Sequence, residues 1–150
     1  MEKLIAIGGG LAGAAALTLL HETIRHQDSD APRMDLLGMS ALSKLLHKLD
    51  TTPPGRDKLY LMTMTGDLLS NTIYYSAAGL GGQKNVWLNG AFLGLSAGLG
   101  AVLLPKPMRL NEGYSGRTTK TKIITVGLYL FGGLVSAATI SLLKKLNNGN

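Results

Sequence analysis

The sequence predicts an all-α integral membrane protein, a four-helix bundle with a cytoplasmic amphipathic helix between the first and second spans. Residues 4–20, 85–105 and 123–143 contain no Asp, Glu, Lys or Arg, and residues 59–83 contain a single charged residue, Asp67. Crossing the hydrocarbon core of a bilayer as a helix takes about 20 predominantly apolar residues. The 20 glycines among 150 residues are also typical of membrane helices, in which small residues allow close packing.

The spans follow in order along one domain, residues 1–150. We expect them at about 4–24, 59–80, 86–104 and 123–143. Gly81 and Gly82 predict a tight turn between the second and third spans, because glycine tolerates positive φ. Pro105 and Pro107 end the third span, because proline cannot continue a helix.

A further helix is predicted over about 36–49, in the connection between the first two spans. Its apolar side carries Met39, Leu42, Leu46 and Leu49, and its polar side carries Ser40, Ser43, Lys44 and His47. This pattern is typical of a helix lying at the membrane surface. The acidic run 28–35 before it predicts a turn, with Asp35 as the N-cap. Binding of Mg²⁺ or a phosphate by this run is an alternative.

The distribution of positive charge predicts the orientation. Eleven Lys and Arg residues lie in the connections 21–58 and 105–122, whereas four lie at the other ends of the spans. The positive-inside rule therefore places both connections in the cytoplasm and both termini outside, in the plasma (inner) membrane. The basic connections would contact anionic lipid headgroups, so we expect the lipid bilayer to be the main partner.

Composition also excludes several classes of function and of binding site. The net charge of +6 comes from residues that flank apolar segments and do not interleave with aromatics, so we expect no nucleic-acid binding. The absence of cysteine excludes disulfides and thiolate metal sites. We expect no cofactor and no metal. A cleaved signal peptide over residues 1–20 is an alternative, but Leu17–Leu20 extend the apolar run beyond its small residues.

Residues 8–13 match the dinucleotide-binding pattern G-x-G-x-x-G. No β pattern and no acidic ribose ligand follow about 20 residues later, so we interpret the glycines as a helix-packing face. Similar spacing recurs later in the chain, at Gly90, Gly94 and Gly98 and at Gly132, Gly133, Ser136 and Ala137. These stripes predict close helix packing, and one left unpaired would allow a homo-oligomer.

A polar face on the second span is the main candidate site. Helical spacing places together Tyr60, Thr63, Asp67, Ser70, Asn71 and Tyr74. Asn89, at the start of the third span, is a candidate amide partner. A charged residue inside a span faces the protein interior or a water-filled cavity and is a candidate for function. The alternative is a structural carboxylate that holds two helices together.

His21, Glu22 and Arg25 form a second cluster at the cytoplasmic end of the first span. The spacing differs from the zinc motif H-E-x-x-H, because Arg25 stands where a histidine is required. Glu22 and Arg25 are better interpreted as an ion pair on the helix surface. Either His21 or Arg25 could also reach toward Asp67.

Four segments resemble small, uncharacterised four-span membrane proteins of bacteria: residues 21–25, 30–35, 66–71 and 104–107. The resemblance covers most of the chain and implies the same fold. It brings no activity, cofactor or catalytic residue with it.

Three functional classes follow from these patterns. We favour a non-enzymatic multi-pass protein that binds or passes a small polar ligand, ion or proton through a polar interior centred on Asp67. The alternatives are a structural or assembly protein that packs through its glycine faces, and a membrane enzyme that acts on a lipid headgroup through His21, Glu22 and the acidic run 28–35.

Overall fold

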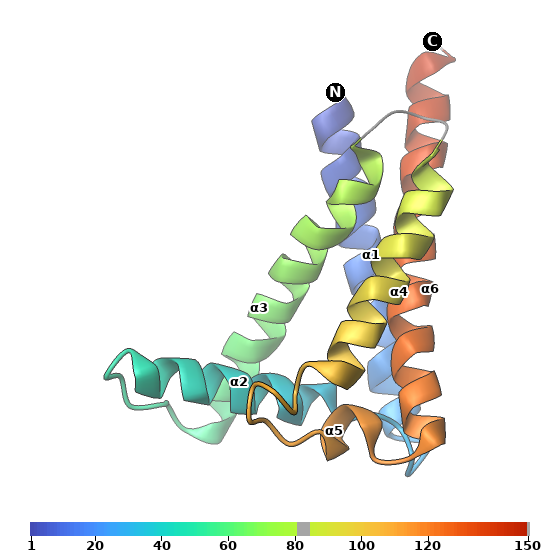
Figure 1. The fold of residues 1–150 in the computed structure, drawn as a ribbon. Helices are drawn as coiled ribbons and strands as arrows, with labels where there is room; N and C mark the ends of the chain where they lie inside the picture. Colours follow the sequence, from blue (N-terminus) through green and yellow to red (C-terminus); the bar gives the residue numbers. More distant parts are fainter. Residues whose placement is uncertain (81–84, 150) are drawn as a thin grey trace.

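The computed structural model describes residues 1–80 and 85–149, and every regular element within them is helical. In chain order these are α1 (Glu2–Arg25), α2 (Met34–Lys48), α3 (Arg56–Ser76), the short 3-10 helix η1 (Ala77–Gly79), α4 (Val86–Leu103), α5 (Gly113–Gly116) and α6 (Thr119–Asn148) (Figure 1). The all-α prediction is confirmed. The turn predicted at Gly81 and Gly82 lies outside the described residues.

Three of these helices, α1, α4 and α6, are long and apolar enough to cross a membrane. Their bounds agree with the predicted spans, although α6 extends beyond its apolar window at both ends. On α4, Leu88 and Phe92 are largely exposed. Side chains of this size on an unpaired helix face are suited to contact with lipid.

The helices are arranged around α1 and α6. α6 packs against both α1 and α4, and α1 packs against α3 on its other side. Both termini lie at one end of the molecule, while α2 and α5 lie at the opposite end (Figure 1). α3 and α4 meet where the Tyr74 hydroxyl donates to the carbonyl of Leu93 at 3.1 Å, and they diverge toward α2 (Figure 1).

Glycines create the closest helix contacts. A Cβ on Gly90 would lie 2.5 Å from the carbonyl oxygen of Gly133, and one on Gly13 would lie 2.5 Å from that of Gly132. Both distances are shorter than van der Waals contact, so only glycine fits at these helix crossings. The predicted packing role of the glycine stripes on α1, α4 and α6 is therefore confirmed. Residues 8–13 lie inside the continuous helix α1, so the dinucleotide-binding alternative is wrong.

The distribution of glycines also bears on the few contacts between α3 and α4. Within α3 the only glycine is Gly66, and it faces open space. α3 therefore has no small-residue surface with which to approach α4. It approaches α1 instead, where Gly10 lies against the Thr72 carbonyl and Ser76.

Polar groups inside the molecule pair with backbone carbonyls of neighbouring helices. The hydroxyl of Tyr75, a fully buried residue, donates to the carbonyl of Tyr129 at 2.8 Å, and the Ser136 hydroxyl donates to the carbonyl of Tyr75 at 3.1 Å. These bonds join α3 to α6. Ser115 similarly ties α5 to α4, by donating to the carbonyl of Ala101 at 2.6 Å.

Candidate functional site

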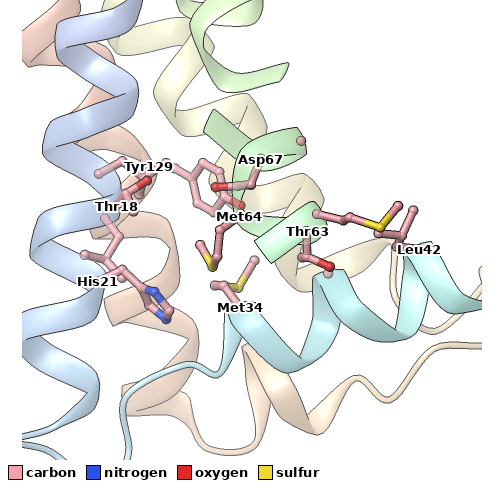
Figure 2. Close-up of a pocket in the computed structure, with 13 residues that line it drawn as sticks. Thr18, His21, Met34, Leu42, Thr63, Met64, Asp67 and Tyr129 are labelled. Atoms are coloured by element: carbon pink, nitrogen blue, oxygen red, sulfur yellow. The ribbon is translucent and has the colours of Figure 1, made fainter. Parts of the chain in front are cut away.

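Asp67 lies near the middle of α3 and faces the interior of the molecule. Figure 2 shows its side chain directed from α3 toward Thr18 of α1 and Tyr129 of α6. Asp67 and Tyr129 both line two cavities, one on each side of them. The carboxylate therefore lies where four elements meet: α1, α2, α3 and α6.

The first cavity has a volume of about 240 Å³ and lies between α1, α3 and α6, with the start of α2 at one side. Its walls are mainly apolar, with Met34 and Met64 beside Asp67 (Figure 2). The polar lining residues are Thr18, His21, Thr63, Asp67 and Tyr129.

The second cavity is larger, about 570 Å³, and lies in the space where α3 and α4 diverge. Its polar residues are Asp67, Ser70, Asn71, Tyr74, Ser96 and Tyr129. Leu37 and Ala41 of α2 close one end, and Leu104 and Met108 extend the apolar wall beyond α4. Most of the polar lining thus comes from α3, with Ser96 of α4 and Tyr129 of α6 added, and the rest of the cavity wall is apolar.

Two buried polar atoms near Asp67 lack a hydrogen-bond partner among the described residues. They are the Thr18 hydroxyl oxygen, beside the first cavity, and the Asn71 amide nitrogen, beside the second. Asn71 is 9% exposed. Since buried polar groups are nearly always hydrogen-bonded, unpaired groups on a cavity wall indicate a place for a further polar partner.

Most of the residues predicted for the polar interior site are brought together. Asp67, Ser70, Asn71 and Tyr74 line the second cavity, and Thr63 lines the first. Thr63 also donates to the carbonyl of Leu59 at 2.8 Å, and Ser70 to the carbonyl of Asp67 at 3.1 Å.

Asn89 is the exception, and its assignment to this site is corrected. Its amide nitrogen lies 3.5 Å from the carbonyl oxygen of Ala78 and 3.4 Å from that of Leu80. Asn89 therefore contacts the chain at the end of α3 and lines neither cavity. The physical reason is that α3 and α4 meet near this end and are separated at the depth of Asp67.

The predicted cluster of His21, Glu22 and Arg25 also forms, with two residues that the sequence analysis assigned otherwise. Arg25 pairs with Glu22 at 2.8 Å and with Asp35 at 3.1 Å, and Arg33 pairs with Asp35 at 2.8 Å. Glu22, Arg25, Arg33 and Asp35 thus form one network of ion pairs. Buried His21 uses its Nε2 atom to bond the Pro32 carbonyl at 2.9 Å, so these groups hold α1 against the start of α2.

Asp35 lies inside the first turn of α2, whereas Arg33 occupies the N-cap, so the predicted N-cap is wrong. The physical reason is that Arg25 and Arg33 both pair with the Asp35 carboxylate. Burial would raise the pKa of Asp35, but the hydrogen bonds from Arg33 and the charges of Arg33 and Arg25 outweigh it and hold the pKa below its usual value.

The rest of the acidic run forms ion pairs with the start of α6 and the residues just before it. Asp28 pairs with Lys120 at 2.6 Å, which lowers the pKa of Asp28 and raises that of Lys120, and Asp30 pairs with Arg117 at 3.4 Å. These pairs favour the predicted turn over a Mg²⁺ or phosphate site. Across residues 1–80 and 85–149, no group of three or more His, Asp or Glu side chains is placed to hold a metal ion.

Tyr129 is the main residue of the site that sequence analysis missed. It lies in the uncharged window of α6, where helical spacing places it on the same face as Thr125 and Ser136. Its place beside Asp67 follows from the crossing of α3 and α6, which no local pattern encodes. A tyrosine hydroxyl inside an apolar window is a weak signal for such a contact, because buried tyrosines usually seek a polar partner.

Comparison of the chain with protein-family models, with curated proteins and with solved structures gave no match. The function has to be inferred from the residues of the site and their chemistry.

Proposed function

We propose that this chain is a four-span membrane protein that binds or passes a small polar ligand, ion or proton at Asp67. The observation that carries the proposal is the position of the Asp67 carboxylate between two cavities, beside polar atoms that lack partners. Intramembrane carboxylates are costly, and they commonly mark ligand, ion or proton sites.

The outward surface of α3 supports its role as the fourth span. Leu61 and Ile73 are 65% and 74% exposed, which suits contact with lipid. The 21 residues of α3 give a length of roughly 31 Å at the helical rise, close to the thickness of the hydrocarbon core. Its polar face is turned toward α1, α6 and the cavities.

A ligand-binding role for Asp67 is favoured over a purely structural one by the partners of its neighbours. None of the ion pairs within the described part of the chain involves Asp67. His21, a basic residue of the first cavity, bonds the Pro32 carbonyl. A carboxylate that served only to join helices would be expected to bond a polar group of another helix, such as the Thr18 hydroxyl of α1, which has no hydrogen-bond partner among the described residues.

The topology can be tested by cysteine labelling, because the natural chain contains no cysteine. We expect a membrane-impermeant maleimide to label Lys48→Cys from the cytoplasmic side, and Leu80→Cys and Asn147→Cys from the outside. All three positions are exposed. If α3 does not cross the membrane, Lys48→Cys and Leu80→Cys will be labelled from the same side, which would contradict the four-span arrangement.

The functional role is tested by Asp67→Asn, which removes the charge and keeps the shape. We expect this variant to fold with nearly unchanged thermal stability and to lose proton or sodium flux across liposome membranes. Asp57→Asn is the matched control, because it makes the same change at the exposed start of α3. A marked loss of stability would instead assign Asp67 a structural role, and unchanged stability and flux would remove it from the site.

A further inference from the structure

The cavity between α3 and α4 carries a further inference about the class of ligand, which rests on the proposed function of Asp67. Of the described residues that line it, Asp67 is the only acidic or basic one. The remaining polar groups are hydroxyls and one amide: Ser70, Asn71, Tyr74, Ser96 and Tyr129. The other lining residues are Met, Leu, Ala, Gly and Pro. The cavity thus combines one negative charge with extensive apolar walls.

This combination favours an organic cation over a bare metal ion. Hard cations such as Ca²⁺ and Mg²⁺ need about six or more oxygen ligands, and this cavity offers one carboxylate with a few neutral oxygens. An organic cation with an apolar body would place its charge against Asp67 and bury its body against Leu37, Leu104 and Met108. Apolar burial contributes about 25 cal/mol per Å².

Size, aromatic lining and position agree with such a ligand. The volume of about 570 Å³ lies within the usual range for small-molecule sites. Tyr129, beside Asp67, and Tyr74, about two helical turns further along α3, supply aromatic rings to the cavity wall, and ring faces attract cations. The cavity lies where α3 and α4 diverge (Figure 1), on the side of the molecule that would face the apolar interior of a bilayer.

We propose that the α3–α4 cavity binds lipophilic organic cations, with the positive charge at Asp67 and the apolar body along α4 and α2. The unpaired amide nitrogen of Asn71, on the same wall, provides a hydrogen-bond donor for an oxygen on the ligand or for the carboxylate itself. Entry from the bilayer requires no opening of the packed interface between α4 and α6.

The test compares two probes of the same shape and opposite charge, tetraphenylphosphonium and tetraphenylborate. Binding to the purified full-length protein is measured by equilibrium dialysis, with equal detergent on both sides. We expect saturable binding of tetraphenylphosphonium and no saturable binding of tetraphenylborate. Asp67→Asn should weaken cation binding by roughly tenfold or more. Equal binding of the two ions would show apolar partitioning only and would overturn the proposal. Equal binding of tetraphenylphosphonium to the wild-type protein and to Asp67→Asn would overturn it in the same way.

A second variant keeps the test decisive if Asp67→Asn fails to fold. Ala97→Leu fills the α3–α4 cavity, leaves Asp67 in place and lies away from the first cavity. We expect Ala97→Leu also to weaken tetraphenylphosphonium binding by roughly tenfold. Leu99→Phe, on the exposed face of α4, is the control and should bind normally. Normal binding by a folded Ala97→Leu protein would place the ligand elsewhere.

The result also separates this inference from the proposed function. If the folded wild-type protein does not bind tetraphenylphosphonium but shows Asp67-dependent proton or sodium flux, the ligand class is wrong and the proposed function stands. If neither binding nor flux depends on Asp67, both are wrong.

Discussion

Gly133→Ala is expected to push α4 away from α6 and to lower the free energy of unfolding by about 3 kcal/mol. A Cβ at this position would lie 3.1 Å from the Cα atom of Gly94 and still closer to the carbonyl oxygen of Gly90. Both obstacles are backbone atoms, which cannot rotate away. Overpacking of a closed interface costs about 1–3 kcal/mol, and a backbone clash between two helices should reach the upper part of that range.

The measurement is the yield of monodisperse protein in detergent together with its thermal unfolding. Gly127→Ala is the matched control, because it lies on the same helix and nothing lies within 4 Å of the added Cβ. We expect Gly127→Ala to have normal or slightly raised stability, since alanine favours helix over glycine. Equal stability of the two variants would show that the contact between α4 and α6 is looser than described.

Asp35→Asn is expected to destabilise the fold at neutral pH and to have no effect in acid. Its carboxylate is 4% exposed and accepts charged hydrogen bonds from Arg25 and Arg33. Removing the charge leaves these arginines with an amide in place of a carboxylate. We expect the free energy of unfolding to fall by about 2–3 kcal/mol. This is less than the loss expected when one partner of an isolated buried ion pair is removed, because Arg25 still pairs with Glu22 and Arg33 is partly exposed.

The pH dependence distinguishes lost charge from lost packing. Because the folded state lowers the pKa of Asp35, its contribution is complete above the unfolded pKa, near 3.8, and is lost as the pH falls through the folded value. The wild-type advantage over Asp35→Asn should therefore begin to fall near pH 3.8 and disappear once the pH is below the folded pKa of Asp35. Thermal unfolding measured across this range tests the prediction, with exposed Asp50→Asn as control. A stability difference that does not change with pH would contradict the role of the charge.

Hydropathy was sufficient to predict α1, α4 and α6, because each contains a continuous apolar segment. For α4, the predicted span 86–104 differs by one residue from Val86–Leu103. The additional length of α6 has local causes that an apolar window does not detect. Thr118 and Thr121 form a capping box before the window, and Lys144 continues the helix after it while bonding the Gly79 carbonyl at 3.4 Å.

The arrangement of the helices could not be predicted in the same way. Glycine spacing indicates that a helix packs closely, but it does not identify the partner, and α1 uses Gly13 for α6 and Gly10 for α3. For the same reason the helical face of Asp67, Asn71 and Tyr74 was predictable, whereas the position of Tyr129 and the separation of Asn89 from Asp67 were not. Those depend on which helices cross, and at what depth.

The few contacts between α3 and α4 mean that stability is distributed unevenly over the molecule. α1, α4 and α6 are joined through backbone atoms at glycines, an arrangement that tolerates almost no displacement. α3 relies mainly on α1, and its edge next to α4 lies along a cavity. Local opening follows the least contacted interfaces. We therefore expect the part of α3 that carries Asp67 to shift relative to α4 more readily than the end held by Gly10 and by the Tyr74–Leu93 hydrogen bond, so that the cavity can adjust its width to its contents.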